Sequence, residues 1–235
     1  MHMSDSAPVM ILFVEDDEVI RTSVAMALER YGYRVDVAED GLTGLERFRR
    51  GGYDLLLLDV MLPGLDGIGL CRRIRETSLD PILMLSARGD SLDVVSGLEA
   101  GADDYVTKPV DTPVLVARIR SLLRRATFAS TARADDPPQT GDRLVFGDVT
   151  IDPAALEVRR GGVHVSLAPT ELRLLLEFAA HPGVVLNRRT LLRNVWDYGW
   201  DGDSRVVDLC VQRLRKKIGS ERIETVRGFG YKLRR

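Results

Sequence analysis

The sequence predicts two domains: an α/β domain built on a doubly wound, five-stranded parallel sheet, followed by a smaller α+β domain. Two observations lead to this prediction. Within residues 1–125, short apolar runs alternate with segments of helical periodicity, and the run at residues 55–58 is apolar on both faces, as in the centre of a parallel sheet. From residue 144 onward, short strand-like segments come first and amphipathic helices follow.

The charge distribution supports the same division. Residues 1–125 contain 15 Lys and Arg against 21 Asp and Glu, whereas residues 126–235 contain 18 against 14. Within the second half, residues 204–235 alone hold 10 basic and 3 acidic side chains. An acidic first domain and a basic end predict that the second domain meets a polyanion such as DNA. We place the first domain at residues 8–125, a linker rich in Ala, Thr, Ser and Asp at 126–142, and the second domain at 143–235.

Composition excludes several other classes of protein. No apolar run approaches the ~20 residues of a membrane span, and the start of the chain does not resemble a signal peptide. Cys71 and Cys210 are far apart in the sequence and fall inside helical patterns, so we expect reduced thiols and neither a disulfide nor a metal site. These features predict a cytoplasmic protein of 235 residues with no membrane partner.

The elements of the first domain follow one another in a regular order. Apolar runs predict five strands, at residues 9–14, 35–38, 55–58, 81–87 and 104–109. Between and after them, apolar residues at helical spacing predict five helices, at residues 19–31, 41–48, 68–75, 91–100 and 114–125. Gly32 and Gly101 follow two of these helices and suit their C-terminal caps.

Polar residues stand at four of the predicted strand ends. They are Glu15 and Asp16, Asp59, Ser86 and Lys108. The carboxyl ends of parallel strands meet at one edge of the sheet, so we expect these side chains to share a small pocket. Three clustered carboxylates are costly unless a divalent cation binds, and oxygen ligands suit Mg²⁺.

The same pocket predicts phosphoryl chemistry. With the metal bound, Asp59 is a carboxylate nucleophile of the kind that forms an aspartyl phosphate. Lys108 and the Ser86 hydroxyl can neutralise and hydrogen-bond the phosphoryl oxygens. Each residue taken singly also has an ordinary structural role: helix or loop capping for Ser86, a surface ion pair for Lys108, and a solvated loop for the acids.

These motifs resemble the receiver domain of response regulators, which has a flavodoxin-like fold. The resemblance covers residues 9–125 and rests on four motifs: Val14-Glu15-Asp16, Leu58-Asp59-Val60-Met61-Leu62-Pro63-Gly64, Ser86-Ala87-Arg88, and Gly101-Ala102-Asp103-Asp104-Tyr105-Val106-Thr107-Lys108-Pro109. It implies that Asp59 accepts a phosphoryl group from a sensor histidine kinase. It implies further that Asp16 and the Met61 backbone carbonyl bind Mg²⁺ directly together with Asp59, that Glu15 is an outer ligand, and that Asp17 lies one place past the pocket and is exposed.

The resemblance also assigns a switch and a dimer face. Ser86 and Tyr105 would form the switch pair, and Lys108–Pro109 a cis peptide, although Val110 stands where relatives usually carry an aromatic residue. Val94 and Val114 replace one ion pair of the family's dimer face. The charged residues that remain on that predicted face are Glu99, Asp103, Asp104, Arg118, Arg120 and Arg125. Alternatively, they are ordinary solvated surface charges, each of which contributes little.

The second domain is predicted to begin with a small antiparallel sheet. Its strands are at residues 144–146, 149–151, 157–159 and 163–165. A helix starts at residues 167–172 with Pro169 near its first turn, a second contains residues 191–196, and a third spans 204–219 with Ser204 as its N-cap. A hairpin follows, with strands at 222–226 and 231–233 and Arg227 at its tip.

The third helix has one apolar stripe and otherwise mainly basic faces. Val207, Val211, Leu214 and Ile218 recur at helical spacing and predict its core side. A helix packed on one side and basic on the other, followed by a basic hairpin, suits a helix in the major groove and a wing in the minor groove of DNA. An ordinary solvated charged face is the alternative.

This region resembles the winged-helix effector domain of OmpR/PhoB-type transcription factors over about residues 144–235. The markers are Leu167-Ala168-Pro169-Thr170-Glu171-Leu172, Val195-Trp196, Arg205-Val206-Val207-Asp208, Leu214-Arg215-Lys216-Lys217-Ile218 and Thr225-Val226-Arg227-Gly228-Phe229-Gly230-Tyr231. The resemblance implies that Arg213 contacts a base, with Val206 and Cys210 on the same face. It implies that Arg227 enters the minor groove and that phosphates are held by Arg205, Arg215, Trp196, Thr225 and Tyr231.

Together these features predict a two-component response regulator that dimerises when phosphorylated and binds promoter DNA, with RNA polymerase a further candidate partner. It would catalyse only its own Mg²⁺-dependent phosphorylation and dephosphorylation. A phosphatase using Asp59 as a turnover nucleophile is the enzymatic rival, but such enzymes commonly place a general acid two residues on, where this chain has Met61. A DNA binder with a vestigial receiver is the other rival, and the complete set of Asp16, Asp59, Ser86 and Lys108 argues against it.

Overall fold

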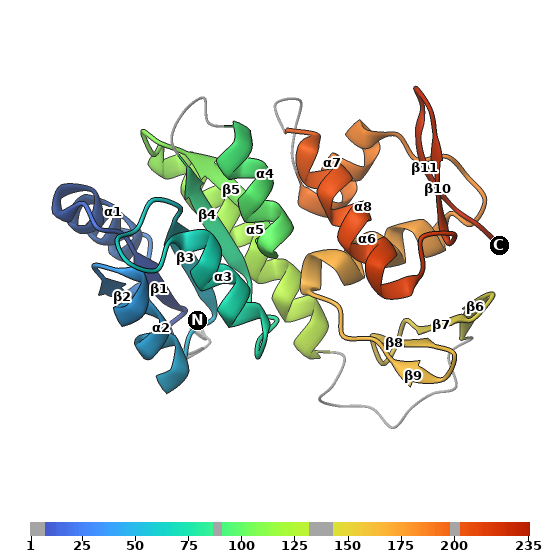
Figure 1. The fold of residues 1–235 in the computed structure, drawn as a ribbon, viewed down its shortest axis with the longest axis horizontal. Coiled ribbons are helices and arrows are strands. Elements are labelled where there is room, and N and C mark those ends of the chain that lie inside the picture. The colour runs from blue at the N-terminus through green and yellow to red at the C-terminus, as the bar shows by residue number, and fades with distance from the viewer. Residues whose placement is uncertain (1–7, 87–90, 132–142, 198–202) are drawn as a thin grey trace, which may run out of the picture. The chain divides into compact units, whose positions relative to one another are not determined.

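The computed structural model describes residues 8–86, 91–131, 143–197 and 203–235 (Figure 1). The chain divides into two compact units between Arg120 and Ser121, a division that falls inside helix α5 (Thr112–Thr131). The helix therefore continues to Thr131, past residue 126 where we expected a linker to begin. The physical reason is local: residues 126–131 include two alanines and neither Gly nor Pro, so nothing in them ends a helix.

The first unit is a five-stranded parallel sheet, as predicted. The strand order is β2-β1-β3-β4-β5, the order of a doubly wound flavodoxin-like sheet. The strands are β1 (Met10–Val14), β2 (Arg34–Ala38), β3 (Leu55–Asp59), β4 (Ile82–Ser86) and β5 (Asp104–Thr107). Every residue of β3 and β4 is buried, which explains why β3 reads as a continuous apolar run.

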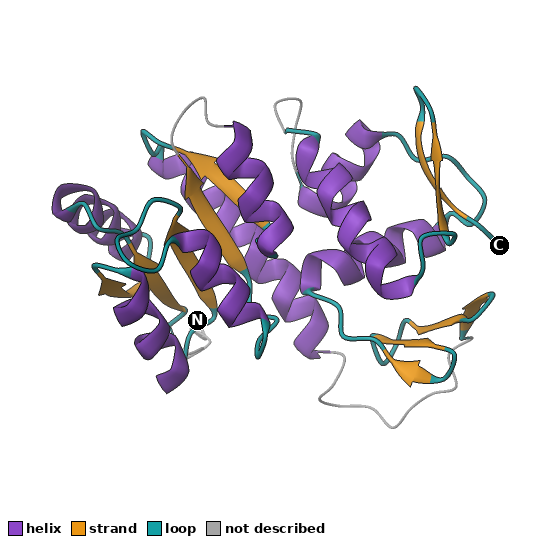
Figure 2. Ribbon diagram, viewed as in Figure 1, coloured by secondary structure: helices purple, strands orange, loops and turns teal. Residues whose placement is uncertain are grey.

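Helices cover both faces of this sheet (Figure 2). They are α1 (Glu18–Arg30), α2 (Gly41–Arg50), α3 (Gly67–Arg75), α4 (Ser91–Ala100) and the first part of α5. Aspartates begin three of them, because the carboxylates of Asp17, Asp40 and Asp66 accept backbone N–H groups of the first turn. Asp17 is exposed, as expected, and is occupied in capping α1.

Helix α3 begins directly beneath the end of β3. The Gly67 N–H donates to the Val60 carbonyl at 3.0 Å, and a Cβ at Gly67 would stand 1.8 Å from the Asp59 carbonyl oxygen. Only glycine permits this approach, so the sequence Asp66-Gly67 fixes where the chain leaves the Asp59 strand end and turns into α3.

Besides the end of α5, the described part of the second unit contains the predicted antiparallel sheet, three helices and a hairpin. The sheet runs β6-β7-β8-β9, with β6 (Leu144–Phe146), β7 (Val149–Asp152), β8 (Glu157–Arg160) and β9 (Val163–His164). The helices are α6 (Pro169–Ala180), α7 (Arg188–Trp196) and α8 (Arg205–Ile218), and the antiparallel hairpin is β10 (Ile223–Val226) with β11 (Gly230–Leu233). The predicted core stripe of α8 is fully buried.

Helices α6 and α8 of this unit are capped in different ways at their N-termini. Pro169 opens α6, and the Glu171 carboxylate accepts the Ala168 N–H at 2.9 Å, as in a capping box. Ser204 stands at the N-cap position of α8, but its hydroxyl makes no capping bond, so that part of the prediction is wrong. Its backbone is already helical, at φ −65° and ψ −14°, and the Asp203 carboxylate takes the Arg205 N–H at 2.8 Å instead.

No helix within the described part of the chain combines the length and apolar character that crossing a membrane requires.

Candidate functional site

The predicted strand-end residues do meet at one edge of the first sheet. Glu15 and Asp16 follow β1, and Asp59 ends the neighbouring strand β3. One carboxylate oxygen from each of these three residues lies within 4.8 Å of the others, close enough to share a metal ion. Lys108 follows β5, on the far side of β4, and completes the group.

Lys108 is shared between two buried acids. Its Nζ lies 2.9 Å from Glu15 Oε1 and 2.9 Å from Asp59 Oδ1. Glu15 is fully buried and Asp59 is 3 % exposed, whereas Asp16 is exposed. The Lys108–Pro109 peptide is cis, as expected, and the Lys108 N–H donates to the Ser86 carbonyl at 2.8 Å. One ammonium group therefore pairs with two carboxylates, in a cluster of three.

Burial and mutual repulsion raise the pKa values of the two buried acids. Burial raises the pKa of Asp59, and the nearby Asp16 charge raises it further, against the opposing effect of Lys108. Burial likewise raises the pKa of Glu15, with Asp59 adding to the effect. For Lys108 burial alone would lower the pKa, but its hydrogen bonds to Glu15 and Asp59 raise it overall. The cluster carries more negative charge than its surroundings satisfy, and a divalent cation on oxygen ligands would relieve it.

Ser86 adds a polar group that has no protein partner among the described residues. Its Oγ is buried at the end of β4 and finds no hydrogen-bond partner there. Leaving a buried hydroxyl unpaired costs roughly 1–3 kcal/mol, so such a group is usually reserved for a ligand. The Met61 backbone hydrogen-bonds the Asp59 carboxylate, while its side chain is 66 % exposed. Tyr105, the other predicted switch residue, is buried on β5.

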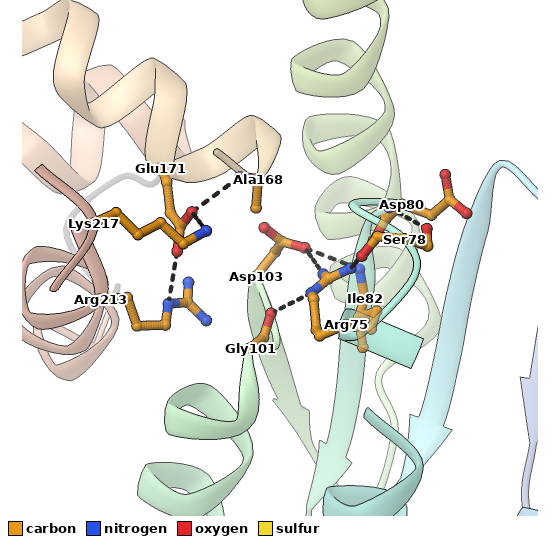
Figure 3. A network of polar contacts seen from close by, with 10 residues as sticks. All are labelled: Arg75, Ser78, Asp80, Ile82, Gly101, Asp103, Ala168, Glu171, Arg213 and Lys217. Atoms are coloured by element: carbon orange, nitrogen blue, oxygen red, sulfur yellow. Dashed lines mark hydrogen bonds and ion pairs between the residues drawn. The ribbon is translucent and has the colours of Figure 1, made fainter. Parts of the chain in front are cut away.

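The predicted base-reading residue Arg213 is held by an acid inside the second unit. Its Nε lies 3.4 Å from Glu171 Oε1, and Lys217, one turn later on α8, places Nζ 2.6 Å from Glu171 Oε2 (Figure 3). Glu171 is 3 % exposed, and Lys217 also donates to the Ser166 carbonyl at 3.0 Å. One carboxylate thus caps α6 and anchors two basic residues of α8.

Helix α8 is tied to the hairpin by the predicted phosphate-binding residues. Arg215 Nε and Nη2 donate to the Ile223 carbonyl at 2.9 and 2.6 Å, and Nη2 also reaches Thr225 Oγ1 at 2.7 Å. The Arg215 guanidinium lies 5.5 Å from the centre of the Tyr231 ring. The structure therefore brings Arg215, Thr225 and Tyr231 together, although Tyr231 is only 5 % exposed, and their role at phosphates stays a prediction.

The other predicted DNA contacts differ in accessibility. Arg227, at the hairpin tip, and Thr225 are exposed, and Arg205 pairs with Asp203 at 2.6 Å. The remaining three, Trp196, Val206 and Cys210, are at most 2 % exposed. Their roles at DNA stay predictions.

Comparison with known proteins identifies the chain. Residues 11–120 match the response regulator receiver domain, and residues 162–233 match the C-terminal domain of transcriptional regulatory proteins. The chain belongs to the OmpR/PhoB-type two-component response regulators. It is 62 % identical over 227 residues to the transcriptional regulatory protein CseB of Streptomyces coelicolor, covering 95 % of this chain and 97 % of that protein.

Other similar proteins agree with this assignment. The transcriptional regulatory protein AfsQ1 of Streptomyces coelicolor is 50 % identical over 95 % of this chain and 97 % of its own length. Among solved structures, a point mutant of RitR is 28 % identical with a TM-score of 0.72, covering 96 % of this chain and 98 % of that one. The two-domain organisation of this response regulator is therefore shared along nearly its whole length.

The predicted dimer face of this response regulator is partly engaged within the first unit. Asp104 pairs with Arg118 at 3.1 Å. Asp103 Oδ2 accepts Arg75 Nη2 at 2.8 Å and the Ile82 N–H at 3.0 Å (Figure 3). Glu99 and Arg120 are exposed, and the side chain of Arg125 lies outside the described residues. The dimer face stays a prediction.

Three residues that contact the predicted site residues received no role from the sequence. Glu171 was only part of a motif, although its spacing from Ala168 carries the signal of a capping box. Arg21 and Arg188 were not singled out at all. Arg188 Nε donates to Asp208 Oδ1 at 2.7 Å, its guanidinium lies 4.9 Å from the Tyr231 ring centre, and Asp208 also accepts the Tyr231 hydroxyl at 2.7 Å. No spacing rule connects residues so far apart, so only the fold reveals these contacts.

Proposed function

We propose that this response regulator accepts a phosphoryl group on Asp59 from a sensor histidine kinase, and that phosphorylation makes it bind promoter DNA as a dimer. The observation that carries the proposal is the pocket at the end of β3: a buried nucleophilic carboxylate, one ammonium group 2.9 Å away and a buried hydroxyl with no partner among the described residues. Conversion of Asp59 to an acyl phosphate changes the charge and the hydrogen-bonding capacity at this point of the sheet.

The transfer step needs only groups that the pocket and the kinase supply. An Asp59 carboxylate oxygen attacks the phosphorus of a phosphohistidine, a P–O bond forms as the P–N bond breaks, and the leaving imidazole nitrogen takes up a proton. Lys108 lies beside the attacking carboxylate and places its positive charge near the phosphoryl oxygens. The Ser86 hydroxyl would donate a hydrogen bond to one of those oxygens.

The acidic cluster fits a resident magnesium ion. Asp16, Asp59 and the Met61 carbonyl would hold it, and Glu15 would be an outer ligand already fixed by Lys108. When bound, Mg²⁺ supplies positive charge that offsets the negative charge of the phosphoryl oxygens during transfer. The raised pKa values of Asp59 and Glu15 support this fit: burial first, and then a neighbouring carboxylate, make their ionised forms costly, and a bound cation would stabilise those forms.

The output side of the proposal rests on helix α8 and the β10–β11 hairpin. After phosphorylation, Ser86 would bond the phosphoryl group and Tyr105 would pack toward it, and the face formed by α4, β5 and α5 would pair with a second copy. Arg213 would then contact a base, and Arg227 would enter the minor groove. Phosphates would be bound by Arg205, Arg215, Thr225 and Tyr231. The bond from Arg215 to Thr225 supports this arrangement, since it links helix α8 to the hairpin.

A labelling experiment tests the first step. The chain is incubated with a radiolabelled small phosphodonor and Mg²⁺, alongside Asp59→Asn and, as matched control, Asp54→Asn. Asp54 lies just before the opposite end of the same strand, where its carboxylate accepts the Met10 N–H at 2.8 Å. Label should enter the wild type and Asp54→Asn and be absent from Asp59→Asn. Equal labelling of Asp59→Asn would show that another residue is the acceptor.

A further inference from the structure

Arg21 holds the backbone of the two acids that follow β1. It lies one turn into α1, and its Nη1 donates to the Glu15 carbonyl and to the Asp16 carbonyl, both at 2.8 Å. A single guanidinium nitrogen therefore fixes two successive peptide groups. Charge-assisted hydrogen bonds of this kind are about twice as strong as neutral ones.

The flanks of this segment are anchored by other groups. The Glu15 N–H donates to the Ala38 carbonyl at 3.0 Å, and the Glu15 side chain is fixed by Lys108. On the other side, Asp17 accepts the N–H groups of Val19 and Ile20 at 2.8 and 2.9 Å. The peptide groups between these anchors are the ones that Arg21 holds.

Asp16 depends most on this backbone anchor. Its carboxylate is exposed, and among the described residues no side chain bonds or pairs with it. Nothing but its own backbone then determines where the carboxylate stands relative to Asp59 and Glu15. By contrast, the Glu15 and Asp59 carboxylates are buried and share Lys108.

We propose that Arg21 is a positioning residue for the divalent cation held by Asp16. The inference rests on the metal site proposed above. Arg21 has two opposing effects on cation binding. As a positive charge near the site it repels Mg²⁺, whereas as a backbone anchor it places Asp16 for coordination. The structure favours the anchor, because the donor nitrogen is engaged by carbonyl oxygens of the ligand-bearing segment itself.

The opposing signs make the test decisive. Mg²⁺ binding to the full chain is measured by isothermal titration calorimetry at fixed ionic strength for the wild type, Arg21→Gln, Arg21→Lys and Arg30→Gln. Arg30, at the end of the same helix, is exposed, so Arg30→Gln removes the same charge without touching the acid segment. Loss of an outer group that orients a ligand typically weakens metal binding by about 10- to 100-fold. We expect about 10-fold weaker binding for Arg21→Gln, about 3-fold for Arg21→Lys, whose shorter side chain keeps the charge, and no change for Arg30→Gln.

Equal or tighter Mg²⁺ binding by Arg21→Gln would overturn the inference and leave Arg21 as a nearby charge only. Circular dichroism checks that each variant is folded. If Arg21→Gln fails to fold, Arg21→Lys decides alone: weaker binding supports the inference and unchanged binding overturns it. Asp16→Asn separates this question from the metal site itself. If the wild type shows no Mg²⁺ binding that Asp16→Asn removes, the proposed metal site is wrong and the role of Arg21 is overturned with it; otherwise the Arg21 variants test positioning alone.

Discussion

Two carboxylate clusters, one in each unit, have opposite charge balances. In the first unit, Glu15, Asp16 and Asp59 form a cluster in which one ammonium group, that of Lys108, pairs with Glu15 and Asp59. In the second, the single carboxylate of Glu171 faces both Lys217 and Arg213 and also accepts a backbone N–H (Figure 3). Asp59 and Glu171 are equally buried, at 3 % exposure each.

Burial of an acid therefore does not by itself determine whether the acid stabilises the fold. The negative charge of Glu171 is balanced, because its carboxylate pairs with two basic side chains and accepts a backbone N–H. Asp59 lies in an unsatisfied cluster, and burial raises its pKa because ionisation there is costly. A buried site that lacks countercharge is prepared for a ligand, and the stability lost there is recovered only when the ligand binds. The same change, from acid to neutral residue, should therefore have opposite signs in the two clusters.

The largest expected effect is the loss of Glu171. Glu171→Ala removes the α6 capping bond and leaves Lys217 and Arg213 without this partner, so the free energy of unfolding of the second unit should fall by about 3 kcal/mol. Both tryptophans of the chain, Trp196 and Trp200, belong to the second half of the sequence, so urea unfolding followed by tryptophan fluorescence reports on this unit. Glu171→Gln keeps an oxygen for the Ala168 N–H and should lose less, about 2 kcal/mol. A stability equal to wild type in both variants would mean that the cluster does not stabilise α6 and α8.

The next effect has the opposite sign. In Mg²⁺-free buffer, Asp59→Asn should raise the free energy of unfolding of the first unit by about 1–2 kcal/mol, because an amide of the same shape relieves the excess negative charge. Urea unfolding followed by circular dichroism measures it. Adding Mg²⁺ should shrink the difference, since only the wild type retains the full set of acidic ligands. A destabilised Asp59→Asn in Mg²⁺-free buffer would contradict the charge balance described above.

Asp40 provides a reference for the stability effect of an acid outside both clusters. Asp40 belongs to neither cluster; its Oδ1 accepts the Thr43 N–H at 2.8 Å and its Oδ2 accepts the Thr43 hydroxyl at 2.7 Å. These hydrogen bonds lower the pKa of Asp40, which shows that its ionised form is stabilised in the fold. Asp40→Ala should cost about 1 kcal/mol as an ordinary N-cap loss, visible as a lower urea midpoint at unchanged slope. Asp40→Asn is the control and should retain most of the stability.

The smallest effect is expected at the surface. Glu224 pairs with Lys232 and Arg234, both at 3.2 Å, on the exposed side of the β10–β11 hairpin. Its pKa is lowered by these partners, but solvent screens such pairs. Glu224→Gln should leave thermal unfolding within experimental error of the wild type. A clear loss would mean that counting partners, regardless of burial, is enough to predict the contribution of an acid.

The sequence predicted the strand-end pocket because a parallel sheet obeys a rule that needs no side-chain detail. Alternating strands and helices place every strand's carboxyl end at one edge, so Asp59 and Lys108 had to be near each other once the strands were recognised. The prediction that the Ser204 side chain caps α8 was wrong because a cap does depend on side-chain detail. Its residue type suits the position, but the local backbone conformation and the neighbouring Asp203 decided which side chain makes the bond.

The sequence alone was enough to predict both folds, the sheet edge at which the strand ends meet, the apolar stripe of α8 and the residues of the acidic pocket. These features depend on periodicity and chain direction, which are local properties. Only the tertiary structure decided that Glu171 anchors Lys217 and Arg213, and that Arg21 bonds the carbonyls of Glu15 and Asp16. The Glu171 contacts join side chains of two packed helices, whereas Arg21 reaches back to the segment just before its own helix. In both cases a polar side chain has several candidate partners until packing leaves it one set.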